Sequence, residues 1–154
     1  MAMPKPKPKV VTHAETMSRP PWEFSKGMNS YVSICTEIEG ARNAIQGWCE
    51  HAPDFEPMVW DQANWDELFF CHKGSLKVLA RDKHGAEKEL VAQEGDSMFL
   101  PAGFHYTLLA TGEQSVNYWT VTPVPSTGIK ALKDLGFDVV GLSEELKAIG
   151  KAKG

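Results

Sequence analysis

The stretch "WDELFFCHKGSLKVLARDKHGAEKEL", residues 65–90, together with "GDSMFLPAGFHYTLL", residues 95–109, decides the fold of this chain. Both alternate short apolar runs with turn residues, which is typical of β-strands. Each also carries one titratable residue in an apolar context, Glu67 in the first and His105 in the second. A buried polar residue costs stability unless it finds a partner, so these two residues are the first candidates for function.

The same alternation of short apolar runs and turn residues continues on both sides of these stretches. Between residues 28 and 122, strand-like runs recur at spacings of roughly 8–12 residues, which is typical of an all-β sandwich or barrel. Residues 75–93 predict a hairpin with its tip at Asp82–Gly85, because Gly85 accepts the positive φ of a tight turn. The sequence therefore predicts an all-β fold with a single barrel over residues 26–125.

The two ends of the chain differ from this central part. Residues 1–25 are rich in proline, which favours an extended N-terminal arm. The arm is either a partly disordered leader or a strap that docks on a partner subunit through Trp22 and Phe24. Residues 126–154 contain "LSEELKAIGKAKG", in which Ser143 is a good helix N-cap, and they predict a short helical C-terminal tail.

Composition narrows the class of protein. A chain of 154 residues with 42% apolar residues suits one globular domain. The net charge of −4, with no basic stripe, argues against a nucleic-acid partner, and no apolar run is long enough for a membrane span. Three cysteines without a CxxC pair favour a reducing compartment. We expect a cytoplasmic protein with a small-molecule ligand, and a homodimer, since an open barrel leaves an edge strand that needs cover.

Two linked motifs carry a family resemblance. In the first motif, Glu67 is followed after six residues by Gly74. The second motif holds, in order, Gly95, Pro101, Gly103 and His105. This pair resembles the two motifs of the cupin superfamily, and the pattern is nearest to the small single-domain cupins similar to 3-hydroxyanthranilate dioxygenase. The resemblance implies a jelly-roll barrel with a ligand or metal site in its mouth.

The resemblance also implies a metal site, which this sequence matches in part. Cupins commonly use two histidines and a glutamate of the first motif and a histidine of the second, a set that suits Fe, Mn, Ni or Zn. Glu67 matches the glutamate and His105 the second-motif histidine. The other two places hold Trp60 and Gln62, or Asp61 and Ala63 if the spacing is one residue shorter. Two alternatives follow, a depleted metal site and a site without metal.

The best three-ligand set that the resemblance offers is Asp61, Glu67 and His105. His105 comes one residue earlier than is common, so Tyr106 is an alternative at that position. We expect strand alternation to turn Glu67 and His105 to the same interior, so that their side chains converge in the barrel mouth. His51, at the end of an earlier strand, is expected to be an exposed loop residue.

Aromatic residues near the motifs favour a planar or apolar organic ligand. We expect the ligand to contact Trp60, Gln62, Phe69, Met98 and Trp119, with Glu67, His105 and Tyr106 as catalytic residues. In ectoine synthase, another cupin that keeps this glutamate and histidine, the third ligand is a tyrosine, and its place falls on Met98 in this sequence. The resulting hypothesis is a metal-assisted enzyme acting on a small organic substrate, of the dioxygenase, isomerase, lyase or cyclase class. The alternative is a metal-free cupin that serves as a non-catalytic binding or assembly module.

Overall fold

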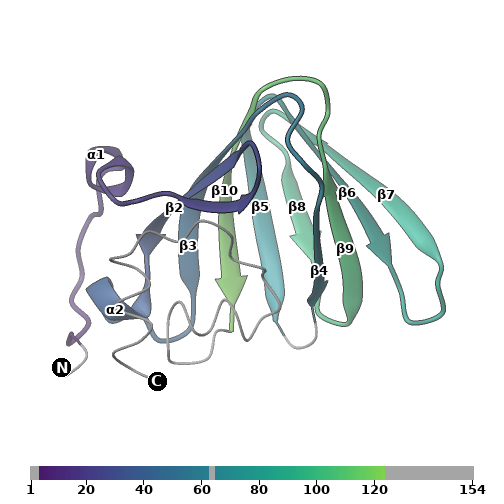
Figure 1. The fold of residues 1–154 in the computed structure, drawn as a ribbon. Helices are drawn as coiled ribbons and strands as arrows, with labels where there is room; N and C mark the ends of the chain where they lie inside the picture. Colours follow the sequence, from purple (N-terminus) through teal and green to yellow (C-terminus); the bar gives the residue numbers. More distant parts are fainter. Residues whose placement is uncertain (1–3, 63–64, 124–154) are drawn as a thin grey trace.

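The chain folds into an all-β jelly-roll barrel made of two antiparallel sheets (Figure 1). This computed structural model describes residues 4–62 and 65–123. The fold class expected from the strand pattern is confirmed. The helical tail expected over 126–154 lies outside the described residues.

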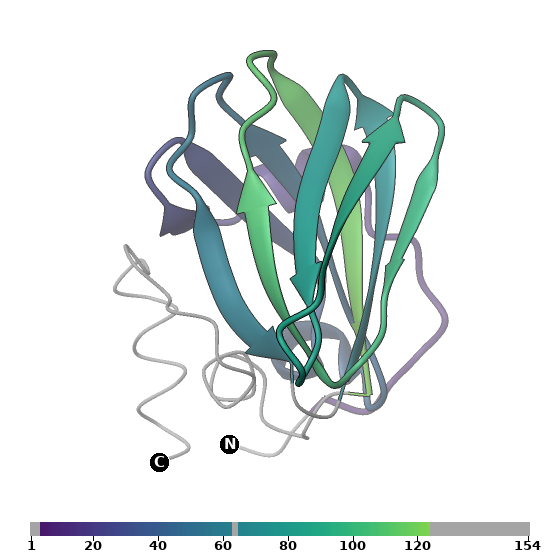
Figure 2. The same ribbon diagram turned by 90° about the vertical axis from the view of Figure 1, so that its right-hand side faces the viewer.

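Each sheet combines strands from distant parts of the sequence. In order, sheet A contains β1 (Trp22–Ser25), β2 (Met28–Ile34), β3 (Ile45–His51), β10 (Ser115–Thr122), β5 (Asp66–Lys73) and β8 (Ser97–Leu100). Sheet B contains β4 (Met58–Gln62), β9 (Phe104–Leu109), β6 (Ser75–Arg81) and β7 (Glu87–Gln93). Figure 2 views the barrel from the side of sheet B, with sheet A behind it.

Two short helices, α1 (His13–Met17) and α2 (Thr36–Glu39), complete the regular elements of the described residues. Thr12 caps α1 reciprocally with Glu15, an arrangement that satisfies two free backbone N–H groups. Over residues 4–62 and 65–123, no helix has both the length and the apolar character that a membrane crossing requires.

Alternation along the strands forms the core between the two sheets. In β5, Glu67, Phe69 and Cys71 are buried while Leu68 and Phe70 are exposed, as the sequence pattern predicts. The hairpin expected over 75–93 is also confirmed, since β6 and β7 pair in register. Its tip is held by the Asp82 carboxylate, which accepts hydrogen bonds from two backbone N–H groups.

The last four residues of the expected N-terminal arm, Trp22–Ser25, form a strand of the barrel, so the barrel begins before the expected boundary at residue 25. β1 pairs with β2 at the edge of sheet A, and a bulge lies between Glu23 and Ser25. Trp22 and Phe24 are buried in the core of their own chain, because alternation in "WEFS" places both rings on the inner face. The expectation that these two rings form a strap across a subunit interface is therefore wrong.

The outer face of sheet A carries exposed apolar side chains. Phe70 lies opposite Tyr118 of β10, and Leu68 lies opposite Phe99 of β8. All four side chains are exposed, and Phe99 is the most exposed of them at 57%. We refer to Leu68, Phe70, Phe99 and Tyr118 as the outer apolar patch.

Candidate functional site

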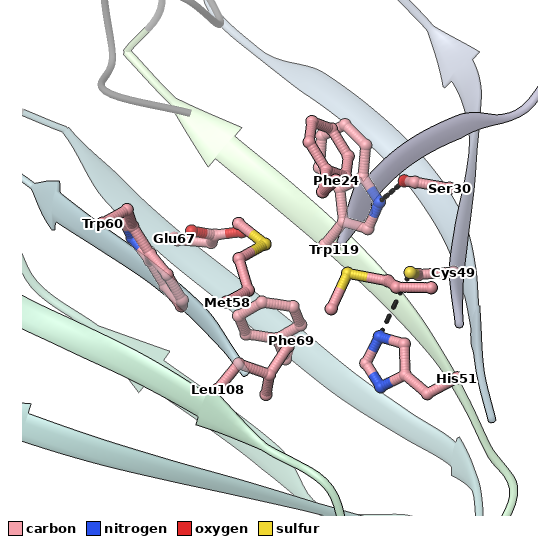
Figure 3. A pocket seen from close by; sticks show the side chains of 11 residues that line it. Phe24, Ser30, Cys49, His51, Met58, Trp60, Glu67, Phe69, Leu108 and Trp119 are labelled. Atoms are coloured by element: carbon pink, nitrogen blue, oxygen red, sulfur yellow. Dashed lines mark hydrogen bonds between the residues drawn. The ribbon is translucent and has the colours of Figure 1, made fainter. Parts of the chain in front are cut away.

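A small cavity lies between the two sheets, on the inner side of the barrel wall (Figure 3). It offers about 30 Å³ to the centres of water-sized molecules. Its lining consists of Phe24, Met28, Ser30, Cys49, His51, Met58, Trp60, Glu67, Phe69, Leu108 and Trp119. Most of these side chains are aromatic or aliphatic, so Glu67 and His51 stand out as its titratable carboxyl and imidazole groups.

Glu67 is a buried carboxyl group with an unsatisfied oxygen. β5 places it between Val121 of β10 and Leu100 of β8, and the residue is 3% exposed. Within the described part of the chain, its Oε2 atom has no hydrogen-bond partner. Burial raises the pKa of Glu67 to about 8, because a carboxylate is poorly solvated in an apolar interior. The group is therefore largely protonated at neutral pH.

The aromatic wall around this carboxyl is held by specific contacts. The Trp119 indole donates to Ser30 Oγ at 2.8 Å. Gly47, opposite Trp119 in the sheet, leaves room for the ring, since a Cβ atom there would clash with it. On sheet B, Trp60 packs against Tyr106 with ring centroids 5.5 Å apart. The cavity walls are thus positioned independently of any ligand.

His51 is buried in the cavity wall, so the expectation of an exposed loop residue is wrong. Its Nε2 lies 3.1 Å from Cys49 Sγ and 3.3 Å from Asn117 Nδ2, and its Nδ1 lies 3.2 Å from Ser115 Oγ. Burial lowers the pKa of His51 to about 4, which keeps the imidazole neutral. Alternation in "IQGWCEH" could have revealed this position, because His51 shares the inner face with Cys49 and Gly47.

His105 lies on the outer side of the barrel wall and does not converge with Glu67. Its Nδ1 is 2.7 Å from Asp61 Oδ1, and the Asp61 side chain is 85% exposed. In β9, Tyr106 and Leu108 are the buried residues, so strand alternation turns His105 outward. The expected convergence of Glu67 and His105 is therefore wrong, as is the inward placement of His105.

Tyr106 takes the inner position that was expected for His105, which is the alternative that the motif spacing left open. Its hydroxyl group donates to the Pro101 carbonyl at 2.6 Å, so it braces the loop before β9. The side-chain amide of Gln62 is also used in hydrogen bonds within the protein. Its amide donates to the Trp65 and Leu100 carbonyls and accepts from the Trp60 indole.

The other expected ligand contacts divide into two groups. Trp60, Phe69 and Trp119 line the cavity, and their binding role stays a prediction. Gln62, Met98 and Tyr106 are buried but are not among its lining residues; Gln62 and Tyr106 contact the lining residue Trp60.

The residues present do not fit the metal site that the resemblance implies. Of the three expected ligands, Glu67 faces the cavity, whereas Asp61 and His105 face outward. Across residues 4–62 and 65–123, no cluster of three or more His, Cys, Asp or Glu side chains is arranged to hold an ion. The expected ligand set does not come together in this fold.

Several solved structures share the fold of this barrel. Oxalate decarboxylase from Bacillus subtilis, a protein with Mn(II) centres, matches with a TM-score of 0.58 and 17% identity. The match covers 70% of this chain and only 28% of that one. EutQ from Clostridium difficile matches with a TM-score of 0.48 and 17% identity, over 62% of this chain and 64% of that chain.

A putative ethanolamine utilization protein q from Salmonella typhimurium gives a TM-score of 0.47 and 22% identity, over 62% of this chain and 69% of that one. No family model matches the chain, and no curated protein does. At this level of identity the likeness shows the cupin fold and not the finer resemblance to 3-hydroxyanthranilate dioxygenase.

Proposed function

We propose that this cupin binds a small organic molecule in the interior cavity and that Glu67 exchanges a proton with it. The observation that carries the proposal is the buried carboxyl group of Glu67, a residue of the cavity lining whose Oε2 atom has no hydrogen-bond partner among the described residues. Native proteins seldom leave such an atom unsatisfied, because the desolvated group loses its bonds to water. A ligand group that bonds to Oε2 would remove this cost.

The pKa of Glu67 supports a role in proton transfer. A general acid or base works best when its pKa lies near the pH of the reaction. A carboxyl group with a pKa of about 8 holds its proton at neutral pH and can still release it at moderate cost. Isomerisation and elimination need only such a proton transfer, so within the classes expected from the sequence we favour the isomerase and lyase classes.

A second candidate function is binding without catalysis. The other polar groups near the cavity are already engaged, His51 with Cys49, Ser115 and Asn117, and the Tyr106 hydroxyl with Pro101. Proton transfer across a substrate usually needs a second group of this kind to complete the cycle. A ligand held by Glu67 alone would stay unchanged.

One experiment tests binding and separates the two functions. Small organic probes are screened by ligand-observed NMR in D₂O against the wild type, Glu67→Gln and His105→Gln. We expect probes that bind the wild type to bind Glu67→Gln at least tenfold more weakly, while His105→Gln, changed on the outer face, behaves as the wild type does. Exchange of a probe's C–H hydrogens for deuterium, lost in Glu67→Gln, identifies an enzyme. Binding that is equal in all three proteins would refute the proposal.

A further inference from the structure

The charge of the cavity restricts which ligands it can hold. Among its lining residues, Glu67 is the one acidic side chain, and none is a lysine or an arginine. The imidazole of His51 points to Cys49 and Asn117 rather than to Glu67, as Figure 3 shows for the Cys49 contact. An anionic ligand would therefore meet no lysine or arginine among the lining residues, and the cost of removing its charge from water would not be offset.

The remaining wall favours a positive charge. Phe24, Trp60, Phe69 and Trp119 contribute aromatic rings to the same cavity lining as Glu67 (Figure 3). The face of an aromatic ring carries negative potential, so it attracts a cation, most strongly where water is excluded. An ammonium group also brings N–H donors, one for Oε2 and others that can point at ring faces.

The size of the cavity limits the charged head of the ligand. A buried water needs roughly 10–15 Å³ on the same measure, so 30 Å³ holds about two heavy atoms. This matches the ammonium nitrogen of a primary amine with its first carbon. A longer chain must displace part of the wall, and Met58, which is unbranched and only partly buried, is the lining residue best able to move.

We infer that the cavity takes the ammonium end of a small primary amine, with Glu67 Oε2 accepting its hydrogen bond and the rings of Trp60 and Phe69 lying around its first carbons. This inference rests on the proposed function, since it assigns a ligand class to the same cavity. A neutral amine that meets the protonated carboxyl group takes the proton from Glu67, and the products are the same ammonium and carboxylate.

The test compares three probes of nearly equal size and different charge. Dissociation constants of n-propylamine, 1-propanol and propionate are measured at pH 7 by NMR titration of the full chain. We expect the amine to bind at least tenfold more tightly than the alcohol, and propionate not to bind. In Glu67→Gln the preference for the amine over the alcohol should disappear, while the outer-face control His105→Gln should keep it.

A second variant keeps the test decisive if Glu67→Gln does not fold. Phe69→Leu keeps an apolar side chain and removes one ring, so it should weaken the amine several-fold more than it weakens the alcohol. Equal or tighter binding of the alcohol in the wild type would overturn the amine assignment and leave the proposed cavity function standing. Failure of all three probes, and of the wider probe screen, to bind folded wild type would overturn both.

Discussion

The raised pKa of Glu67 has a direct consequence for stability. Its pKa is about 8 in the folded protein against 4.5 for the ordinary group. Between these values the folded state holds a proton that the unfolded state has released, so stability is full below pH 4.5 and falls as pH rises towards 8. Each pH unit corresponds to about 1.4 kcal/mol. Replacing Glu67 by Gln removes the titration and should flatten this fall.

Between pH 6.5 and pH 8, the effect of Glu67 ionisation on stability can be measured apart from that of its titratable neighbours. His51 has an ordinary pKa of 6.5 and a lowered one in the fold, so it is largely neutral in both states above pH 6.5. Of the groups that interact with Glu67, the Cys49 thiol and the Tyr106 hydroxyl have pKa values raised by burial, and both stay neutral here. Because half of the native carboxyl groups are ionised at pH 8, the expected loss in the wild type relative to Glu67→Gln is about 1.5 kcal/mol.

Urea unfolding at pH 6.5, 7.0, 7.5 and 8.0 measures this difference. The wild type and Glu67→Gln are compared at each pH, with His105→Gln as a surface control. Other titrating groups cancel in the comparison, because both proteins share them. The control should follow the wild type. If the free energy of unfolding changes with pH equally in the wild type and in Glu67→Gln, the pKa of Glu67 is not raised. The argument that its pKa suits proton transfer would then be refuted.

Three further predictions concern other parts of the barrel. The lowered pKa of His51 makes the wild type lose stability as pH falls from 6.5 towards 4, and acid unfolding of His51→Gln should show a shallower slope. Gly47→Ala should lower the free energy of unfolding by about 1–3 kcal/mol in thermal melts, because the new methyl group meets the Trp119 ring; an unchanged melting temperature would contradict this packing. The homodimer stays a prediction: sedimentation should give a dimer that Phe99→Glu, within the outer apolar patch, dissociates, and a wild-type monomer would refute it.

Local patterns in the sequence were sufficient for much of the fold. The hairpin over 75–93 and the alternation of β5 follow from turn residues and from a period of two, which depend only on near neighbours. The inward direction of Glu67 and Phe69 was therefore predictable. Alternation in "WEFS" could likewise have predicted that Trp22 and Phe24 are buried, but the neighbouring prolines favoured an extended arm over a strand.

The candidate site was harder to predict because its geometry depends on strand parity in β9. A shift of one residue reverses which side chains face inward. The family motif suggested either His105 or Tyr106 at the inner position, and only the packing of Tyr106 against Trp60 selects between them. The inward direction of His51 follows from the alternation of β3, but its place at the end of the expected strand favoured an exposed loop residue.

Phe24 contributes to the cavity wall from an edge strand, so the shape of the cavity can change at this residue while the central strands of the barrel stay the same. This residue lies at the bulge of β1, an edge strand that pairs with β2 alone, yet its ring forms part of the cavity wall. Bulges reorient a side chain while the neighbouring ladder stays intact. Changes at this one position can therefore enlarge or reshape the cavity without disturbing the central strands that carry Glu67. Variation in a short N-terminal segment would let one scaffold evolve, or be engineered, towards amines of different bulk.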